Sequence, residues 1–328
     1  MTAVSEAATS SALRTREATV RRFAFTDMAF RTATRLSAIL VLVLLGGVAI
    51  SLIAGSWEAL SKFGFSFLTT ESWNPVTENF GALAPIYGTI VTSAIAILIA
   101  VPIGIGIAVF LTELCPRPLR RPIGIAVELL AGIPSIIYGI WGLFVFAPFL
   151  QTTVQPFIIN IFHGIPGLSS LFAGPPYGIG LLTSSLILAI MVLPFITSIT
   201  KDVFDTVPAV LKESAYGIGC TTWEVTRRVT IPYTRVGIMG GVMLGLGRAL
   251  GETMAVTFVI GNAHRISASL FAPGTTISAT IANEFTEADG ALYTSSLVSL
   301  GLILFIITFI ILALARYMLL RIDSRTGA

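Results

Sequence analysis

Residues 212–262 read KESAYGIGCTTWEVTRRVTIPYTRVGIMGGVMLGLGRALGETMAVTFVIGN. The first half of this stretch is polar and charged, whereas the second half is apolar over a length that can cross a membrane. This combination predicts a loop that docks onto another protein and leads directly into a membrane helix.

The composition of the whole chain agrees with a membrane protein. Hydrophobic residues make up 55% of its 328 residues and charged residues 11%, and the mean hydropathy is +0.89. A soluble domain of this length keeps more charge on its surface. The apolar residues fall in six long runs, near 36–54, 84–112, 123–150, 179–200, 237–261 and 293–316. Because a backbone in lipid must satisfy its own hydrogen bonds, we expect an all-α integral membrane protein with six transmembrane helices.

The runs and the charges between them suggest four segments. Residues 1–35 form a basic tail, expected to be solvated and partly disordered near anionic lipid. Residues 36–83 hold the first transmembrane helix and an outer segment, 84–320 form the transmembrane domain with a loop at 201–236, and 321–328 form a second tail. Placing the amino terminus inside puts seventeen of the twenty Lys and Arg residues on the inner side. Both termini and the 201–236 loop are therefore predicted to be cytoplasmic.

The loop contains a spaced pattern. Glu213, Ser214 and Ala215 are followed by three residues, then Gly219, then nine residues, then 229–232, which read VTIP. This pattern resembles the EAA loop of binding-protein-dependent ABC importers, although Ser, Val and Ile replace the usual Ala, Ile and Leu at positions 214, 229 and 231. The resemblance implies a coupling helix that sits in a cleft of an ATPase subunit. The residues it assigns to this contact are Glu213, Ala215 and Gly219, with Ser214, Tyr216 and Gly217 as neighbours.

A narrower resemblance covers the chain from about Asn74 onward and is strongest in 247–262, which read GRALGETMAVTFVIGN. This part is similar to the PstC-type permease subunits of phosphate-specific ABC importers. The resemblance implies a type I ABC importer permease fold, a bacterial inner (plasma) membrane location and import of inorganic phosphate. It also implies a PstA-type second permease, two PstB-type ATPases and a PstS-type external phosphate-binding protein as partners, with no nucleic acid.

The sequence offers no ATP-binding motif. A P-loop requires Gly-Lys followed by Ser or Thr, but the three lysines precede Phe63, Asp202 and Glu213. We therefore expect a non-catalytic subunit that binds no cofactor, with ATP and Mg²⁺ on the partner ATPase. No metal site is expected either, because the two cysteines are isolated and His163 and His264 read as ordinary residues of outer loops.

Two charges stand inside the fifth apolar run. Arg248 and Glu252 are four residues apart, so on one helix they would share a face and pair. Arg248 lies about 16 Å along the helix from Gly237, near the middle of a core about 30 Å thick. One interpretation is a self-neutralising structural ion pair. The other is an anion pathway in which Arg248 attracts the substrate while Glu252 orients Arg248 and weakens its grip. The family resemblance favours the pathway.

The third apolar run carries another acid, Glu128, near its predicted cytoplasmic end. A pair with Arg121 is the favoured interpretation, and a gate or a partnership with Arg248 is the alternative. Pro134 in the same run predicts a local break, near which Ser135 and Tyr138 are candidates to line a cavity.

Two further features leave alternatives open. The glycines at 237, 241 and 245 allow close helix packing, either with a second permease subunit or within this chain. The outer segments, 151–178 and 262–292 among them, are candidates for the rim where an external binding protein docks. Within the second segment, the acidic run 283–289 is either a docking patch or a solvated turn.

Three other functions were weighed against phosphate import. A permease for molybdate, sulfate or another oxyanion would share every feature above. A secondary anion transporter would need no ATPase-docking loop and often shows repeated halves. A membrane-embedded enzyme would need a convergent catalytic set, which the apolar runs do not contain.

Overall fold

The computed structural model describes residues 2–162, 164–165 and 167–323, with side chains from Thr26 onward except at positions 168, 320, 322 and 323. His163 and the end of the predicted tail 321–328 lie outside the described residues. The chain forms two compact units, Met1–Ala54 and Gly55–Ala328, and each is described by itself.

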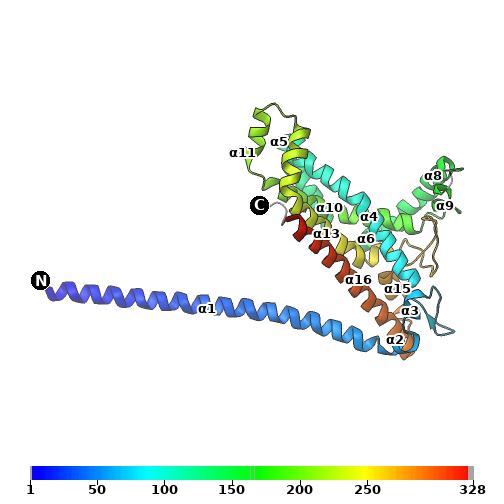
Figure 1. The fold of residues 1–328 in the computed structure, drawn as a ribbon, viewed down its shortest axis with the longest axis horizontal. Helices are drawn as coiled ribbons and strands as arrows, with labels where there is room; N and C mark the ends of the chain where they lie inside the picture. The colour runs from blue at the N-terminus through cyan, green and yellow to red at the C-terminus, as the bar shows by residue number, and fades with distance from the viewer. Residues whose placement is uncertain (1, 163, 166, 324–328) are drawn as a thin grey trace. The chain divides into compact units, whose positions relative to one another are not determined.

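The first unit is one helix, α1 (Thr2–Gly55), drawn in blue in Figure 1. Its half from Thr26 is long and apolar enough to cross a membrane, and apolar side chains such as Leu40 and Val43 are exposed all round it. Such a helix is suited to lipid on every side. The prediction of a partly disordered tail is wrong for residues 2–35, because this run has no Gly or Pro and the helix continues through it.

The second unit contains five further spans, so the prediction of six is confirmed. The continuous ones are α4 (Leu83–Val109) with the π-helical turn η1 (Phe110–Leu114), α10 (Leu181–Asp205) and α16 (Ala291–Asp323). One composite span comprises α6 (Ser135–Trp141), η2 (Gly142–Phe146), α7 (Ala147–Phe149), η3 (Leu150–Val154) and α8 (Gln155–Phe162). The other comprises α12 (Thr222–Val225), η4 (Thr226–Thr230) and α13 (Ile231–Gly251).

The third span lies later in the chain than the predicted run 123–150. Residues 117–131 form a separate helix, α5 (Arg117–Ala131), and the spanning segment is Ser135–Phe162. The helix breaks at Gly132 because Pro134 takes an extended conformation (φ −56°, ψ 136°) and begins a new helix. Apolar character alone therefore merged two helices that a proline separates.

The fifth span also differs from the predicted run 237–261. It begins at Thr222, where Thr221 and Glu224 form a capping box, and it ends at Gly251. Glu252 leaves the helix with an extended backbone (φ −69°, ψ 130°), and one short helix follows, α14 (Met254–Thr257). Backbone of this kind is tolerated at membrane depth only where protein covers it. Here Val256, Val259 and Ile260 are buried.

The bundle is organised around α10. In its apolar window 61% of the residues are buried within the chain, against 28% or less in the other spans. It packs along α4 and α13, as Figure 1 shows. Glycines permit this approach, since a Cβ at Gly104 would lie 3.0 Å from a side-chain carbon of Ile196. Close backbone contact is what holds helices together in lipid, because lipid tails are as apolar as the side chains.

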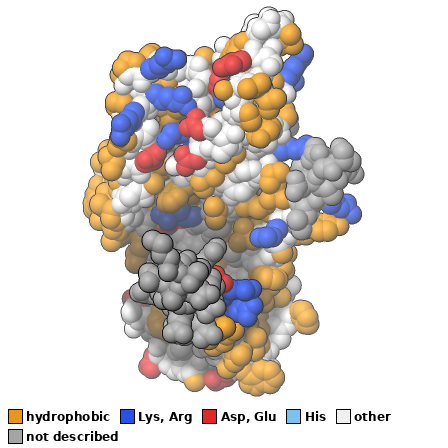
Figure 2. All heavy atoms as spheres, turned by 90° about the vertical axis from the view of Figure 1, so that its left-hand side faces the viewer, with side chains coloured by type: hydrophobic (Ala, Val, Ile, Leu, Met, Phe, Trp, Pro, Cys, Tyr) orange, Lys and Arg blue, Asp and Glu red, His pale blue; other side chains and the backbone are white. Residues whose placement is uncertain are grey.

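One end of the second unit carries α5 and α11 (Ala209–Gly217), and we call it the α11 end. Figure 2 shows acidic and basic side chains gathered toward the upper part of the molecule, at the level of this end in Figure 1. The opposite end carries α2 (Trp57–Phe63), α3 (Ser66–Thr69), the strands β1 (Trp73–Asn74) and β2 (Asn79–Phe80), α9 (Leu168–Leu171) and α15 (Ile277–Glu284).

The opposite end has its own apolar core. The strands pair antiparallel, with Trp73 opposite Phe80, and the Asn74 carboxamide oxygen accepts hydrogen bonds from the backbone of the turn between them. Phe80 packs with Phe67 and Ile277 in a buried cluster. This core fixes the outer segments onto the ends of the spanning helices.

Candidate functional site

Arg248 lies in the last turn of α13, within the bundle. Its guanidinium carbon stands 4.4 Å from the centre of the Phe195 ring on α10, and its Nε is buried without a hydrogen-bond partner. No carboxylate of the described residues lies within ion-pair distance of Arg248.

The predicted pair between Arg248 and Glu252 is therefore absent from the structure. Spacing by four residues brings side chains together only while both belong to one helix, and Glu252 is already outside it. The Glu252 side chain, which is 9% exposed, instead accepts a hydrogen bond from the Ala255 backbone N–H at 3.3 Å. It caps the short helix α14.

The break after Gly251 puts the two charges in different backbone environments. A cation in the last turn of a helix interacts favourably with the free carbonyl groups there, by about 0.3–1 kcal/mol and up to about 2 kcal/mol when partly buried. Glu252 is satisfied by a backbone amide. The local structure thus leaves the Arg248 guanidinium without a neutralising carboxylate.

Tyr138 and Ser135 lie on α6, directly after the break at Pro134. Tyr138 is buried in the central core, and its hydroxyl donates a hydrogen bond to the carbonyl oxygen of Leu130 at 3.0 Å. This bond ties α6 to α5 across the break. Ser135 is half-buried. Tyr138 thus links two helices, and the cavity lining predicted for Ser135 and Tyr138 stays a prediction.

The helix α6 is held close to α14. A Cβ at Gly139 would lie 2.7 Å from the Phe258 ring and 2.9 Å from the Met254 carbonyl oxygen, so only glycine fits there. The segment that follows Arg248 is thus packed against the segment that carries Tyr138.

Glu128 belongs to α5 and not to a spanning helix, which corrects its predicted position. Its partner is also different from the predicted Arg121, because Lys201 on α10 donates to its Oε1 at 2.9 Å. The chain fold brings these two side chains together from positions 73 residues apart. No contact between Glu128 and Arg248 is present among the described residues.

Glu128 is one of three carboxylates paired with a cation at the α11 end. Arg120 meets Asp205 at 2.6 Å, and Lys212 meets Glu113 at 2.6 Å. The Glu113 pair is the most buried, with side chains 19% and 7% exposed for Lys212 and Glu113. These pairs link α5 to α10 and α11 to η1. Sequence reasoning missed them because their partners are far apart in the chain.

The EAA-like segment forms α11. Ala215 is buried against the chain, whereas Glu213, Ser214, Tyr216, Gly217 and Gly219 are exposed. Four large apolar side chains on and beside α11 are also more than 40% exposed, namely Val210, Leu211, Tyr216 and Ile218. Of the six residues assigned to ATPase contact, Ala215 anchors the helix to the chain and the other five are accessible to a partner.

The turn after α11 depends on glycine. Gly219 has φ +91°, a left-handed conformation that favours residues without a Cβ, and it lets the Cys220 N–H bond the Ala215 carbonyl oxygen at 3.1 Å. The helix α12 starts two residues later. The prediction of two short helices joined by a glycine-bearing turn is confirmed.

The glycine series of the fifth span packs within this chain. A Cβ at Gly237, Gly241 or Gly245 would lie 2.5–3.0 Å from side chains of α10. Of the two alternatives left open by the sequence, intrachain packing is the one that the structure shows for these three positions.

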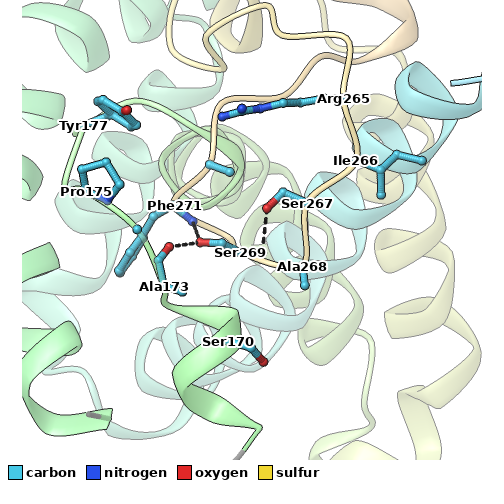
Figure 3. A pocket seen from close by; sticks show the side chains of 12 residues that line it. Ser170, Ala173, Pro175, Tyr177, Arg265, Ile266, Ser267, Ala268, Ser269 and Phe271 are labelled. Atoms are coloured by element: carbon cyan, nitrogen blue, oxygen red, sulfur yellow. Dashed lines mark hydrogen bonds between the residues drawn. The ribbon is translucent and has the colours of Figure 1, made fainter. Parts of the chain in front are cut away.

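A pocket of about 420 Å³ opens at the opposite end, between residues 170–177 and 265–272 (Figure 3). Its walls are joined by two hydrogen bonds, from the Ser269 hydroxyl to the Ala173 carbonyl at 2.5 Å and from the Leu270 N–H to the Leu171 carbonyl at 2.8 Å. Figure 3 shows the Arg265 side chain extending from the second wall toward Tyr177. None of the described lining residues is Asp or Glu, and Arg265 has no ion-pair partner among them.

Glu284 lies nearby in a different environment. Its carboxylate accepts hydrogen bonds from the Trp73 indole at 2.5 Å and the Tyr293 hydroxyl at 2.7 Å, and it meets His264 Nε2 at 2.8 Å. Burial raises the pKa of this carboxyl, but the hydrogen bonds and the charge of His264 outweigh burial, so the net pKa is lowered. Glu284 is therefore neither a docking patch nor part of a solvated turn.

The chain is similar to proteins of a known transport family. The family described as binding-protein-dependent transport system inner membrane component matches residues 100–324. A relative named phosphate transport system permease protein PstC from Mesorhizobium japonicum is 87% identical, over 95% of this chain and 96% of the relative. Relatives of the same name from Pasteurella multocida (58% identical, 92% and 94% covered) and, as PstC 1, Mycobacterium tuberculosis (42%, 84% and 82%) also match.

Solved structures show the same fold at low sequence identity. The bacterial ABC transporter that imports the acidic polysaccharide alginate superposes with a TM-score of 0.58 at 18% identity, covering 87% of this chain and 95% of that one. Its complex with an alginate-bound periplasmic protein gives a TM-score of 0.58 at 19% identity, covering 88% and 94%.

Proposed function

The chain belongs to the family of binding-protein-dependent transport inner membrane components, with PstC permeases as relatives, and from this we infer that it is the permease subunit of a phosphate importer. It is a multi-pass membrane protein of the ABC permease fold. The anion moves through the membrane into the cytoplasm, and a separate ATPase subunit binds Mg²⁺ and hydrolyses ATP.

The observation that carries the proposal is the state of Arg248. Arg248 lies in the last turn of its span rather than at the middle that the sequence predicted, but a charge within a bundle of membrane helices is still costly and is retained where it has a function or a partner. Arg248 has a ring and a helix end near it, and no carboxylate of the described side chains lies within ion-pair distance. Its guanidinium therefore keeps its positive charge for a transported anion. Glu252 stabilises the turn after Gly251 through its hydrogen bond with the Ala255 N–H, and it does not form an ion pair with Arg248.

The orientation is part of the same proposal. The basic residues of α5, of 201–236 and of the end of α16 support a cytoplasmic α11 end, with the opposite end outside. In this orientation α11 faces the ATPase. The exposed apolar side chains of α11 suit insertion into a groove of that partner.

The coupling helix is attached to the bundle at two points. Ala215 lies on the buried face of α11, and Lys212 pairs with Glu113 in η1, the turn that follows α4. A displacement of α11 by the ATPase is therefore passed to α4. Because α4 packs along α10 and α10 packs on α13, the movement can reach Arg248. The exposed coupling residues of this proposal are Glu213, Ser214, Tyr216, Gly217 and Gly219.

The external partner is a phosphate-binding protein, and the Arg265 pocket supports its docking at the opposite end. The pocket lies between the two outer segments that the sequence marks as candidates for a docking rim. Its walls are cross-linked, and its lining contains Arg265 and no Asp or Glu, while Glu71 beside it accepts a hydrogen bond from the Ile266 N–H at 2.5 Å. Such a pocket is complementary to an acidic protrusion. A PstA-type permease and a pair of PstB-type ATPases complete the assembly.

ATP-dependent uptake of labelled phosphate tests the proposal directly. The chain is reconstituted in vesicles with its candidate permease, ATPase and binding-protein partners, and sulfate and molybdate serve as competitors. We expect saturable phosphate uptake that a Pro substitution at Ala215 abolishes, because proline in the interior of α11 breaks the helix. Uptake of a different oxyanion would remove phosphate from the proposal, and uptake independent of ATP would contradict the importer.

A matched control separates coupling from folding. Thr206→Pro lies just outside α11, at the end of α10, and tests the general effect of proline in this loop. The Ala215→Pro assembly should be recovered with its ATPase stimulation lost. Retention of coupled uptake by Ala215→Pro would show that α11 is not the coupling helix.

A further inference from the structure

The contact between Arg248 and Phe195 is unusual for a buried cation. A guanidinium in apolar surroundings is commonly matched by a carboxylate, and two half-buried cations among the described residues, Lys201 and Lys212, each have one. Arg248 instead lies over the face of the Phe195 ring, with 4.4 Å between its guanidinium carbon and the ring centre. The ring is the electrostatic contact that the described residues provide for this charge.

The position of the ring is set by the packing of two helices. Gly245 lies one turn before Arg248, and a Cβ there would stand 3.0 Å from side-chain carbons of Val192 and Ile196. Ile196 directly follows Phe195 on α10. The close approach at Gly245 therefore brings the Phe195 ring under Arg248. The contact is built into the interface between α10 and α13 and does not depend on a flexible surface side chain.

We propose that Phe195 is a positioning residue that holds Arg248 for the transported anion without neutralising its charge. This inference rests on the proposed function, since it assigns a second residue to the same anion site. A carboxylate partner would compete with the anion for the guanidinium. An aromatic face attracts a cation through its quadrupole and carries no net charge, so it orients Arg248 while the charge stays available.

The same arrangement limits how tightly the anion is held. A permeating ion must bind well enough to enter the site and weakly enough to leave. The ring takes up one face of the planar guanidinium, and the buried Nε has no hydrogen-bond partner among the described residues. An anion therefore gains the remaining N–H donors and can depart without breaking an ion pair within the protein.

The ratio of phosphate transported to ATP hydrolysed, measured at saturating loaded binding protein, tests this role. A purely structural defect lowers transport and hydrolysis together, whereas a misplaced Arg248 lowers transport alone. We expect Phe195→Leu to lower the ratio about fivefold, which corresponds to about 1 kcal/mol of cation–π interaction. Phe195→Tyr keeps the ring face and should stay within about twofold of the wild type.

Two further variants keep the test decisive. Phe195→Met has a similar volume and no ring, so it replaces Phe195→Leu if that variant fails to assemble. Phe204→Leu removes a fully buried ring from the same helix in another cluster, and should lower the yield of the assembly while leaving the ratio unchanged. In an Arg248→Gln background, Phe195→Leu should have no further effect on the ratio.

The outcomes separate this inference from the proposed function. The wild-type assembly shows which oxyanion is transported, and the variants are then compared with it using that oxyanion. An unchanged ratio in Phe195→Leu and Phe195→Met would overturn the positioning role, as would a Phe195→Tyr variant as defective as Phe195→Leu. A wild type that transports no oxyanion would overturn both.

Discussion

The α11 end and the Arg248 site handle charged side chains in different ways. At the α11 end, Glu113, Glu128 and Asp205 each meet a cation within 3 Å. At the Arg248 site the cation meets a ring and a helix end, and the nearby Glu252 is occupied by a backbone amide. Charges that are paired within the chain serve its architecture, while a charge that the chain leaves unpaired is available to a ligand.

Removing the unpaired charge should have the largest effect. In Arg248→Gln we expect phosphate uptake to fall at least about 100-fold, equivalent to about 2.7 kcal/mol, with assembly and ATP hydrolysis retained. Vesicle uptake and hydrolysis measured on the same preparation check this. Arg248→Lys keeps the charge without the planar donors, and should be intermediate. Normal uptake in Arg248→Gln would place Arg248 with the structural charges.

Breaking the most buried pair should come next. In the intact pair the Glu113 side chain is 7% exposed and the Lys212 side chain 19%. Glu113→Gln leaves Lys212 without its partner, and should destabilise the protein by about 2 kcal/mol. Thermal unfolding of the purified chain in detergent measures the loss. Because the penalty comes from the stranded charge, adding Lys212→Met should recover most of the stability. No recovery in the double variant would argue against an ion-pair role.

Glu284 tests a carboxylate held by hydrogen bonds rather than by a permanent cation. Its pKa is lowered in the folded protein from the ordinary value of 4.5. A lowered pKa stabilises the fold above the unfolded value, and the contribution is lost as the pH falls through the folded value. We therefore expect stability to decline below about pH 4.5, measured by thermal unfolding between pH 6 and pH 3. In Glu284→Gln this part of the pH dependence should disappear, and an unchanged profile would contradict the assignment.

The smallest effect should come from the exposed pair at the α11 end. The side chains of Arg120 and Asp205 are 38% and 47% exposed, so solvent screens their attraction. Arg120→Gln should change the free energy of unfolding by less than about 1 kcal/mol and leave uptake intact. A loss as large as that of Glu113→Gln would show that exposure does not rank these pairs.

Several features were accessible from the sequence because they depend on local pattern. The length and number of apolar runs predicted six spans, and the glycine at 219 together with the flanking residues predicted two short helices and a turn. The EAA-like spacing and the GRALGET run indicated the importer family. The roles assigned to single residues, from Glu213 to Arg248, stay predictions, as do the proposed segment boundaries.

Other features were predicted wrongly because local pattern does not fix them. The run 123–150 reads as one apolar stretch, but Pro134 divides it and moves the span to Ser135–Phe162. Glu128 has Arg121 seven residues away, yet Lys201 is its partner because α5 lies along α10. An ion pair depends on distances in space, which a sequence gives only between near neighbours.

The Arg248 site shows most clearly which features the sequence determines and which the tertiary structure determines. The sequence by itself determined that a cation stands inside an apolar run and that glycines before it permit close packing, but it predicted the cation near the middle of the span. Tertiary structure decided that the helix ends at Gly251, that Glu252 turns away, and that Phe195 from another helix lies under the guanidinium. The physical reason is that the cost of a buried charge is set by whatever surrounds it in space, and those neighbours come from distant parts of the chain.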